Sequence, residues 1–157
     1  MVEIRLKKVK TSDLDFFFQH MQDKKAQYMA AFIPEDPSNR KSFDNHWNRL
    51  LSDKDIIART IYYEGSIIGH VAKFVLFDRP EITYWIDRDY WGRGIAGQAV
   101  QLFLDEVEVR PIYARAAKDN SRSIRVLEKC GFSVIGYDKY YANARGKEIV
   151  EVILRKG

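Results

Sequence analysis

Three glycines and an arginine lie together in the segment YWGRGIAG, residues 90–97, directly before residues that predict a helix. Glycines let the main chain approach a ligand closely, and the unpaired N–H groups of a helix N-terminus carry partial positive charge. The segment therefore suits a phosphate or pyrophosphate, to which Arg93 could add a full positive charge. The alternative is that Gly92, Gly94 and Gly97 only permit a tight turn.

The spacing of the glycines excludes two common phosphate-binding motifs. Gly92, Arg93 and Gly94 are followed by Ala96 and Gly97 at the wrong spacing for the dinucleotide-binding fingerprint. The sequence also contains no Gly-Lys-Ser or Gly-Lys-Thr, which a P-loop requires. A second motif is needed to decide between a ligand site and a turn.

The second motif is NSRSIRVLEKCGF, residues 120–132, which predicts a helix that follows a strand and ends at Gly131. With both motifs, the sequence resembles the GNAT superfamily of acetyl-coenzyme A dependent N-acetyltransferases. It is most similar to the branch that includes ribosomal-protein N-terminal acetyltransferases. EITYWIDRDYWGRGIAGQAV resembles the family's fourth strand, pyrophosphate loop and third helix, and NSRSIRVLEKCGF resembles its Asn-x-x-Ser…Glu-Lys-x-Gly-Phe segment.

The resemblance implies a binding site for acetyl-coenzyme A. Main-chain amides of the loop would hold the phosphates, although Trp91 replaces the polar residue that usually begins the family's loop motif. Main-chain groups of residues 85–87 would pair with the pantetheine arm like an added strand. Asn120 and Ser123 would line the arm near the sulfur. The expected contacts are Trp85, Ile86, Asp87, Trp91, Gly92, Arg93, Gly94, Ile95, Ala96, Gly97, Asn120 and Ser123.

The acetyl transfer that the resemblance implies needs a neutral amine, a polarised carbonyl and a stabilised thiolate. An alkylamine titrates near the lysine value of roughly 10.4, so it requires a proton acceptor at neutral pH. Glu81 opens the strand expected to face the acetyl group and is the candidate base, acting directly or through a water. The alternative is a solvent-exposed glutamate at the end of a strand, after Pro80.

The proton donor to the thiolate is a separate question, because Leu127 occupies the position where the family often has a tyrosine. Ser123 is the expected substitute, and Tyr140 or Tyr141 on the following strand are reserves. Direct protonation by water also remains open, since a thiol of pKa about 8.5 is a tolerable leaving group. Cys130 is interpreted as a small buried hydrophobic residue rather than a nucleophile.

Hydrophobic patterns predict the elements that must position these residues. Strands are predicted over 3–9, 56–64, 67–77, 81–87, 111–117, 132–141 and 148–155, and helices over 11–22, 38–53, 96–107 and 120–130. Hairpins at both ends and a strand–helix–strand crossover between them imply an α/β fold. The expectation is a single N-acetyltransferase domain over residues 1–157, with a mixed, mostly antiparallel sheet of about seven strands and about four helices.

Composition limits the function classes. A chain of 157 residues that is 46% hydrophobic suits one compact domain, and no apolar run predicts a membrane span or secretory signal, so a cytoplasmic protein is expected. The net charge is +4, and the basic residues are interspersed with 22 acidic ones, a pattern that indicates a solvated surface or equally favours a phosphorylated ligand and is weak support for nucleic-acid binding. One cysteine and the scattered His20, His46 and His70 predict neither a disulfide nor a metal centre.

The expected partners are therefore acetyl-coenzyme A and a primary amine that attacks directly in a ternary complex, without nucleic acid or membrane, in a monomer or homodimer. A protein or peptide N-terminal α-amine, a polyamine, an amino sugar or a small metabolite amine would all be compatible. The alternative is a sensor or partner module that binds acyl-coenzyme A without turnover, which Leu127 would suit. A nucleic-acid-binding domain is a third interpretation and predicts steeply salt-dependent affinity.

Overall fold

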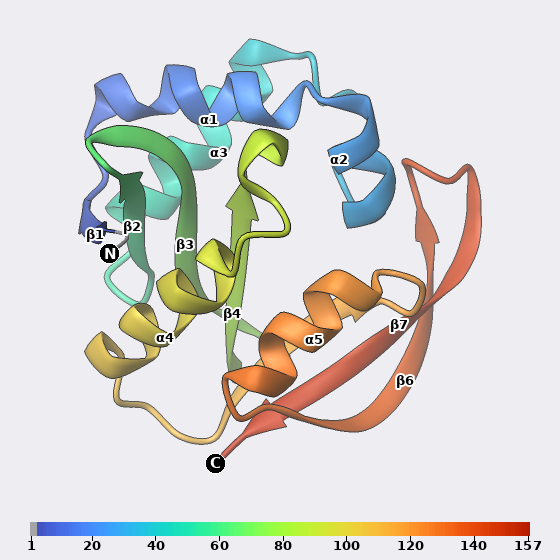
Figure 1. Ribbon diagram of the computed structural model, residues 1–157. Coiled ribbons are helices and arrows are strands. Elements are labelled where there is room, and N and C mark those ends of the chain that lie inside the picture. The colour runs from blue at the N-terminus through green and yellow to red at the C-terminus, as the bar shows by residue number, and fades with distance from the viewer. Residues whose placement is uncertain (1–2) are drawn as a thin grey trace.

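The computed structural model describes residues 3–157, which form one seven-stranded sheet in the order β1-β2-β3-β4-β5-β7-β6 (Figure 1). The strands are β1 (Ile4–Lys8), β2 (Ile57–Tyr63), β3 (Ser66–Leu76), β4 (Arg79–Ile86), β5 (Ile112–Ala117), β6 (Ser133–Ala142) and β7 (Lys147–Lys156). The helices are α1 (Leu14–Met21), α2 (Lys24–Ala30), α3 (Arg40–Ser52), α4 (Ile95–Glu106) and α5 (Ser121–Lys129). The expected mixed, mostly antiparallel α/β architecture is confirmed.

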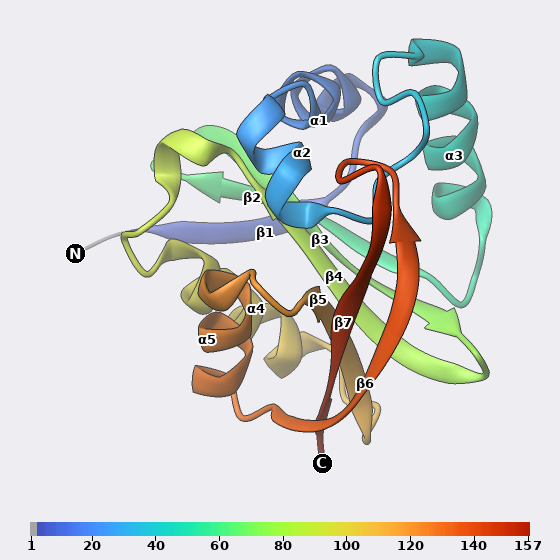
Figure 2. The ribbon, with the colours of Figure 1, turned by 90° about the vertical axis from the view of Figure 1, so that its right-hand side faces the viewer.

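The junction between β4 and β5 is the feature of the sheet that matters most for function. All other neighbouring strands are antiparallel, whereas β4 and β5 run parallel and are paired only at Glu81 and Tyr113. Beyond that pair the strands diverge, and β5 pairs along its length with β7. In Figure 2 the β6–β7 hairpin runs across the direction of β3 and β4. The sheet therefore opens into a V whose sides are β4 and β5.

Helices cover both faces of the sheet (Figure 2). On one face, Ile82 and Ile86 of β4 belong to a buried apolar cluster with Phe103 of α4 and Leu127 of α5. On the other face, α1 and α3 contribute Phe17 and Trp47 to a second cluster. Because successive strand residues point to opposite faces, residues 81, 83 and 85 of β4 lie on the α1–α3 side.

Helix α2 is the element that the sequence patterns did not predict. Its segment KKAQYMA is one short stretch without a clear apolar stripe, so its periodicity carries little signal. The Asp23 carboxylate caps the helix by accepting a hydrogen bond from the Ala26 N–H at 3.0 Å. The buried Gln27 side chain donates to the Met21 carbonyl at 2.7 Å and ties α2 to the end of α1. The helix thereby closes over the wide end of the V.

Within residues 3–157, no helix is long and apolar enough to cross a membrane. Over the same described residues, no group of three or more His, Cys, Asp and Glu side chains is arranged to hold a metal ion.

Candidate functional site

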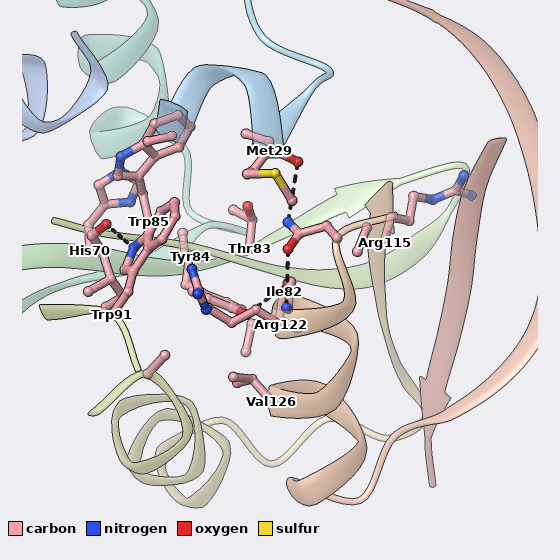
Figure 3. A pocket seen from close by; sticks show the side chains of 18 of the residues that line it. Met29, His70, Ile82, Thr83, Tyr84, Trp85, Trp91, Arg115, Arg122 and Val126 are labelled. Carbon is pink, nitrogen blue, oxygen red and sulfur yellow. Dashed lines mark hydrogen bonds between the residues drawn. The ribbon is translucent and has the colours of Figure 1, made fainter. Parts of the chain in front are cut away.

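A cleft of about 1050 Å³ opens where β4 and β5 diverge (Figure 3). The cleft is lined by residues of the helices α1 to α5, of the strands β3, β4, β5 and β7, and of the segment between β4 and α4. Asp87 and Arg93 are not among the lining residues. Of the residues predicted from the sequence, the cleft brings together Glu81, Trp85, Ile86, Trp91, Gly92, Gly94, Ile95, Ala96, Gly97, Asn120 and Ser123.

The glycine segment forms an open main-chain surface at the start of α4. Gly92 and Gly94 have φ angles of 77° and 74°, which side-chain-bearing residues adopt only at a cost. Gly94 is the N-cap of α4, and no side chain caps the first turn, so the N–H groups of residues 95–97 have no helical partner. A Cβ at Gly92, Gly94 or Gly97 would meet no atom within 4 Å. The glycines thus set the conformation, and the space beside them is free for an anion.

Beside the glycine segment, the positive side chains that line the cleft come from α5 rather than from Arg93. The Arg93 guanidinium lies over the ring of Tyr90 at 5.5 Å from its centroid. Arg122 instead lies 4.8 Å from the centroid of Trp91, whose indole N–H donates to the Ile86 carbonyl at 2.9 Å (Figure 3). Arg125 and Lys129 also line the cleft. Their i, i+3 and i+7 spacing in the sequence was the signal that could have identified this basic face.

The hydrogen bond between Asp87 and β3 shows which main-chain groups of β4 face the cleft. The Asp87 N–H donates to the Ile68 carbonyl of β3 at 2.7 Å, and the Asp87 carbonyl accepts from the Tyr90 N–H at 2.9 Å. Because antiparallel strands alternate between residues that bond to the neighbour and residues that face away, Trp85 also bonds toward β3. Tyr84 and Ile86 therefore point their main-chain groups away from β3 and toward the cleft, where the Ile86 carbonyl already accepts from the Trp91 indole. Of residues 85–87, which were predicted to pair with a ligand, only Ile86 faces this way, and Tyr84 is a position that the prediction did not include.

Asn120 is the N-cap of α5, Ser123 lies in its first turn, and both residues line the cleft. The Asn120 carbonyl oxygen caps α5 by accepting from the Ser123 N–H at 3.3 Å, and its amide donates to the Met29 carbonyl at 3.3 Å. The Ser123 hydroxyl lies 2.8 Å from the hydroxyl of Tyr84. Burial raises the pKa of Tyr84 to about 12, so the phenol stays protonated. The sequence analysis did not single out Tyr84, because its partner is 39 residues away.

Glu81 lines the cleft as a buried carboxylate, with only 1% of the residue exposed. The alternative of a solvent-exposed strand end is wrong. Its Oε1 lies 3.6 Å from Nε of Arg115, whose Nη1 donates to Glu151 at 3.2 Å. Its Oε2 has no hydrogen-bond partner among the described residues. Burial raises the pKa of the Glu81 carboxyl, and the charge of Arg115 opposes that rise. Glu81 is thus paired in charge with Arg115 at a distance longer than a hydrogen bond, and its Oε2 has no partner among the described residues.

The rest of the cleft around Glu81 is aromatic and apolar. The ring of His70 lies 4.8 Å from that of Phe17 and 4.9 Å from that of Trp47. Burial, together with the charges of His20 and His46, lowers the pKa of His70 to about 3. Buried Nδ1 of His70 and Nε1 of Trp85 lack partners among residues 3–157. Met21, Met29, Phe32, Leu50 and Phe74 complete the wall.

The other residues considered from the sequence lie outside the cleft lining or in the apolar core. Leu127 is 1% exposed and packs in the main apolar cluster. Cys130 is 5% exposed, and burial raises the pKa of its thiol, which confirms its interpretation as a buried hydrophobic residue. Tyr140 and Tyr141 lie on the edge strand β6 and are not among the lining residues, and the Tyr140 hydroxyl donates to Asp138 at 2.9 Å.

Comparisons with known proteins agree with this geometry. Residues 3–133 match the family described as the acetyltransferase (GNAT) domain. YdaF of Bacillus subtilis (strain 168), named as a candidate ribosomal N-acetyltransferase, is 29% identical over 138 residues, which cover 80% of this chain and 75% of YdaF.

Two solved structures show how far the fold is shared. RimJ of Mycobacterium smegmatis, in complex with CoA-disulfide, matches with a TM-score of 0.81 at 21% identity, over 97% of this chain and 80% of RimJ. The microcin C7 self immunity acetyltransferase MccE, in complex with acetyl-CoA and AMP, matches with a TM-score of 0.80 at 19% identity, over 98% of this chain and 92% of MccE. At these identities the likeness establishes the common fold.

Proposed function

The chain belongs to the acetyltransferase (GNAT) domain family, and from this premise we propose that it moves an acetyl group from acetyl-coenzyme A to a primary amine by direct attack in a ternary complex. The acceptor would be the N-terminal α-amine of a protein or peptide, or a small-molecule amine. The observation that carries the proposal is the unpartnered Oε2 of Glu81, a buried carboxylate oxygen in the same cleft as the uncapped N-terminus of α4.

The donor end of the cleft fits acetyl-coenzyme A in its chemistry. Unpaired amides at the start of α4 and the side chains of Arg122, Arg125 and Lys129 suit phosphates. The main-chain groups of Tyr84 and Ile86 suit the amides of a pantetheine arm. When bound, acetyl-coenzyme A supplies the activated carbonyl and the thiol leaving group.

Glu81 would accept the proton that the amine must lose. A carboxylate with a raised pKa is a stronger base than a free one. The nearby positive charge of Arg115 stabilises the ionised form of Glu81. Because the pKa is raised, the basic form is lost as the pH falls through that value, so the rate should decline on the acidic side. The two carboxylates of Glu81 and Glu151 face the single positive charge of Arg115, and this excess of acidic groups favours a cationic acceptor.

Ser123 would donate a hydrogen bond to the departing sulfur. The residue lies in the first turn of α5, where unpaired N–H groups add a favourable partial charge for a developing anion. Leu127, at the position of the usual tyrosine, is buried in the apolar core.

A screen of amines with detection of released thiol tests the proposal. Purified protein would be mixed with acetyl-coenzyme A and, in separate reactions, with N-terminal peptides, polyamines, amino sugars and amino acids. We expect amine-dependent thiol release by the wild type with at least one class. Binding of acetyl-coenzyme A without release for any amine would instead favour the sensor module.

A further inference from the structure

Two hydroxyl groups, one from β4 and one from α5, contact each other in the cleft. The Tyr84 hydroxyl, from β4, lies 2.8 Å from the Ser123 hydroxyl, from α5 (Figure 3). Neither oxygen has another hydrogen-bond partner among the described residues. Both residues line the cleft in which the two substrates would meet. The contact joins β4 to the first turn of α5 inside the cleft.

The chemistry of the two groups decides which one donates. A phenol is a stronger hydrogen-bond donor than an alkyl alcohol, and Tyr84 remains protonated because its pKa is raised to about 12. This difference favours the arrangement in which the Tyr84 O–H donates to the Ser123 oxygen. In that arrangement the single hydrogen of the Ser123 hydroxyl is directed away from Tyr84 and is free for a ligand in the cleft.

We propose that Tyr84 is a positioning residue, which fixes the Ser123 hydroxyl so that its hydrogen is available to the leaving sulfur of acetyl-coenzyme A. This inference rests on the proposed function. The apolar core holds Leu127 at the position where a tyrosine is usual, so the tyrosine of this site comes from β4 and acts through the serine.

The electron balance of the step is simple. As the amine nitrogen forms its bond to the carbonyl carbon, the C–S bond breaks and its electron pair stays on the sulfur. The Ser123 O–H stabilises that charge by a hydrogen bond and keeps its proton. The proton that the amine loses goes to Glu81, and the thiolate takes its final proton from solvent. Tyr84 is neither consumed nor charged at any point.

The test compares two ligands that differ only at the sulfur. Dissociation constants for coenzyme A and desulfo-coenzyme A would be measured by calorimetry between pH 7 and 10, with wild type, Tyr84→Phe and Ser123→Ala. A donor at the sulfur lowers the pKa of the bound thiol below its free value of about 8.5. For a shift of one unit, the wild-type preference for coenzyme A should rise about tenfold across this range. Both variants should lose most of that rise, measured for each variant relative to its own affinity for desulfo-coenzyme A.

Tyr113→Phe is the matched control, because Tyr113 lies on β5 outside the cleft lining and loses the same single oxygen. It should keep the wild-type preference. Ser123→Thr, which retains the hydroxyl, should restore most of the rise that Ser123→Ala removes. In turnover, Tyr84→Phe should lower kcat rather than raise KM for acetyl-coenzyme A, and it should add little to Ser123→Ala in the double variant.

The outcomes separate this inference from the proposed function. A wild-type protein that binds neither ligand would overturn both. Normal binding, with a preference that does not change with pH or that Tyr84→Phe leaves intact, would overturn the role of Tyr84 alone.

Discussion

The two ends of the cleft are built in different ways. The donor end consists of contiguous segments, residues 91–97 and 120–129, and offers mainly main-chain N–H groups and basic side chains of one helix face. The acceptor end consists of side chains from separate elements, including Glu81, Arg115 and His70. A ligand common to a family can thus be recognised by a local motif. Recognition of the acceptor depends on long-range packing, which can change while the motif stays.

The largest effect should come from Glu81→Gln, which removes the base at the acceptor end and leaves the donor end intact. Loss of general base catalysis typically lowers the rate by about 10² to 10⁴. We expect kcat to fall by that amount while the dissociation constant of acetyl-coenzyme A stays within about twofold of wild type.

Glu151→Gln is the control for Glu81→Gln, since Glu151 is the other buried carboxylate beside Arg115. It should have the smaller effect on kcat. If Glu151→Gln were as slow as Glu81→Gln, the carboxylates would act as a structural unit, and Glu81 would lose its role as base.

Gly94→Glu tests the donor end and should weaken binding of acetyl-coenzyme A by about 100-fold, because it places a carboxylate beside the phosphate site and strains a left-handed residue. Calorimetry gives the dissociation constant. The control is Gly146→Glu in the β6–β7 turn, which has a φ angle of 67° and equally open surroundings. Equal losses in both variants would assign the effect to backbone strain and not to a phosphate site.

His70 gives the acceptor end a pH-dependent stability. Its pKa of about 3 in the folded protein lies below the ordinary value of 6.5, so between these values the unfolded state binds more protons. The free energy of unfolding should therefore fall by about 1.4 kcal/mol for each unit of acidification below pH 6.5. Raised pKa values of Glu81 and Glu151 act in the opposite direction.

His70→Phe isolates the contribution of His70, because it keeps an aromatic ring against Phe17 and Trp47 while the two glutamates remain. Urea unfolding at pH 7, 6 and 5 should show a shallower decline for the variant than for the wild type. Parallel declines would mean that His70 titrates normally in the folded protein.

The smallest effect should come from Arg122→Ala. This variant removes one exposed charge from the donor end, together with the guanidinium that lies over the Trp91 ring. An exposed charge contributes up to about 1 kcal/mol, so affinity for acetyl-coenzyme A should fall by about fivefold at most, and by less at high salt. Arg155→Ala, an exposed arginine on β7 away from the cleft lining, should leave the affinity unchanged. An identical loss in both variants would indicate a general effect of net charge.

Prediction from the sequence succeeded where the signal is local. The helix expected over 38–53 is α3 (Arg40–Ser52), and the strands β2 and β3 match those expected over 56–64 and 67–77 to within one residue at each end. The glycine segment and the Asn120 motif each begin a helix and meet in one cleft, as their order along the chain implied. Each of these features depends on residues within one turn or one strand.

What could not be predicted depends on pairing between distant segments. Insertion of β7 between β5 and β6 places Glu151 beside Arg115, 36 residues away, and so creates the ion cluster around Glu81. The burial of Glu81 follows from strand register, which the sequence pattern alone left open. The contact of Tyr84 with Ser123 likewise requires the β4–β5 divergence, for which the sequence carried no signal.

Calorimetric titration of the wild-type protein with acetyl-coenzyme A, with dephosphorylated pantetheine as the control ligand, tests the central claim most directly. The geometry at the start of α4 predicts saturable binding that depends on the pyrophosphate. Absence of binding, or equal binding of both ligands, would mean that Gly92 and Gly94 only shape a turn and would contradict the proposed function.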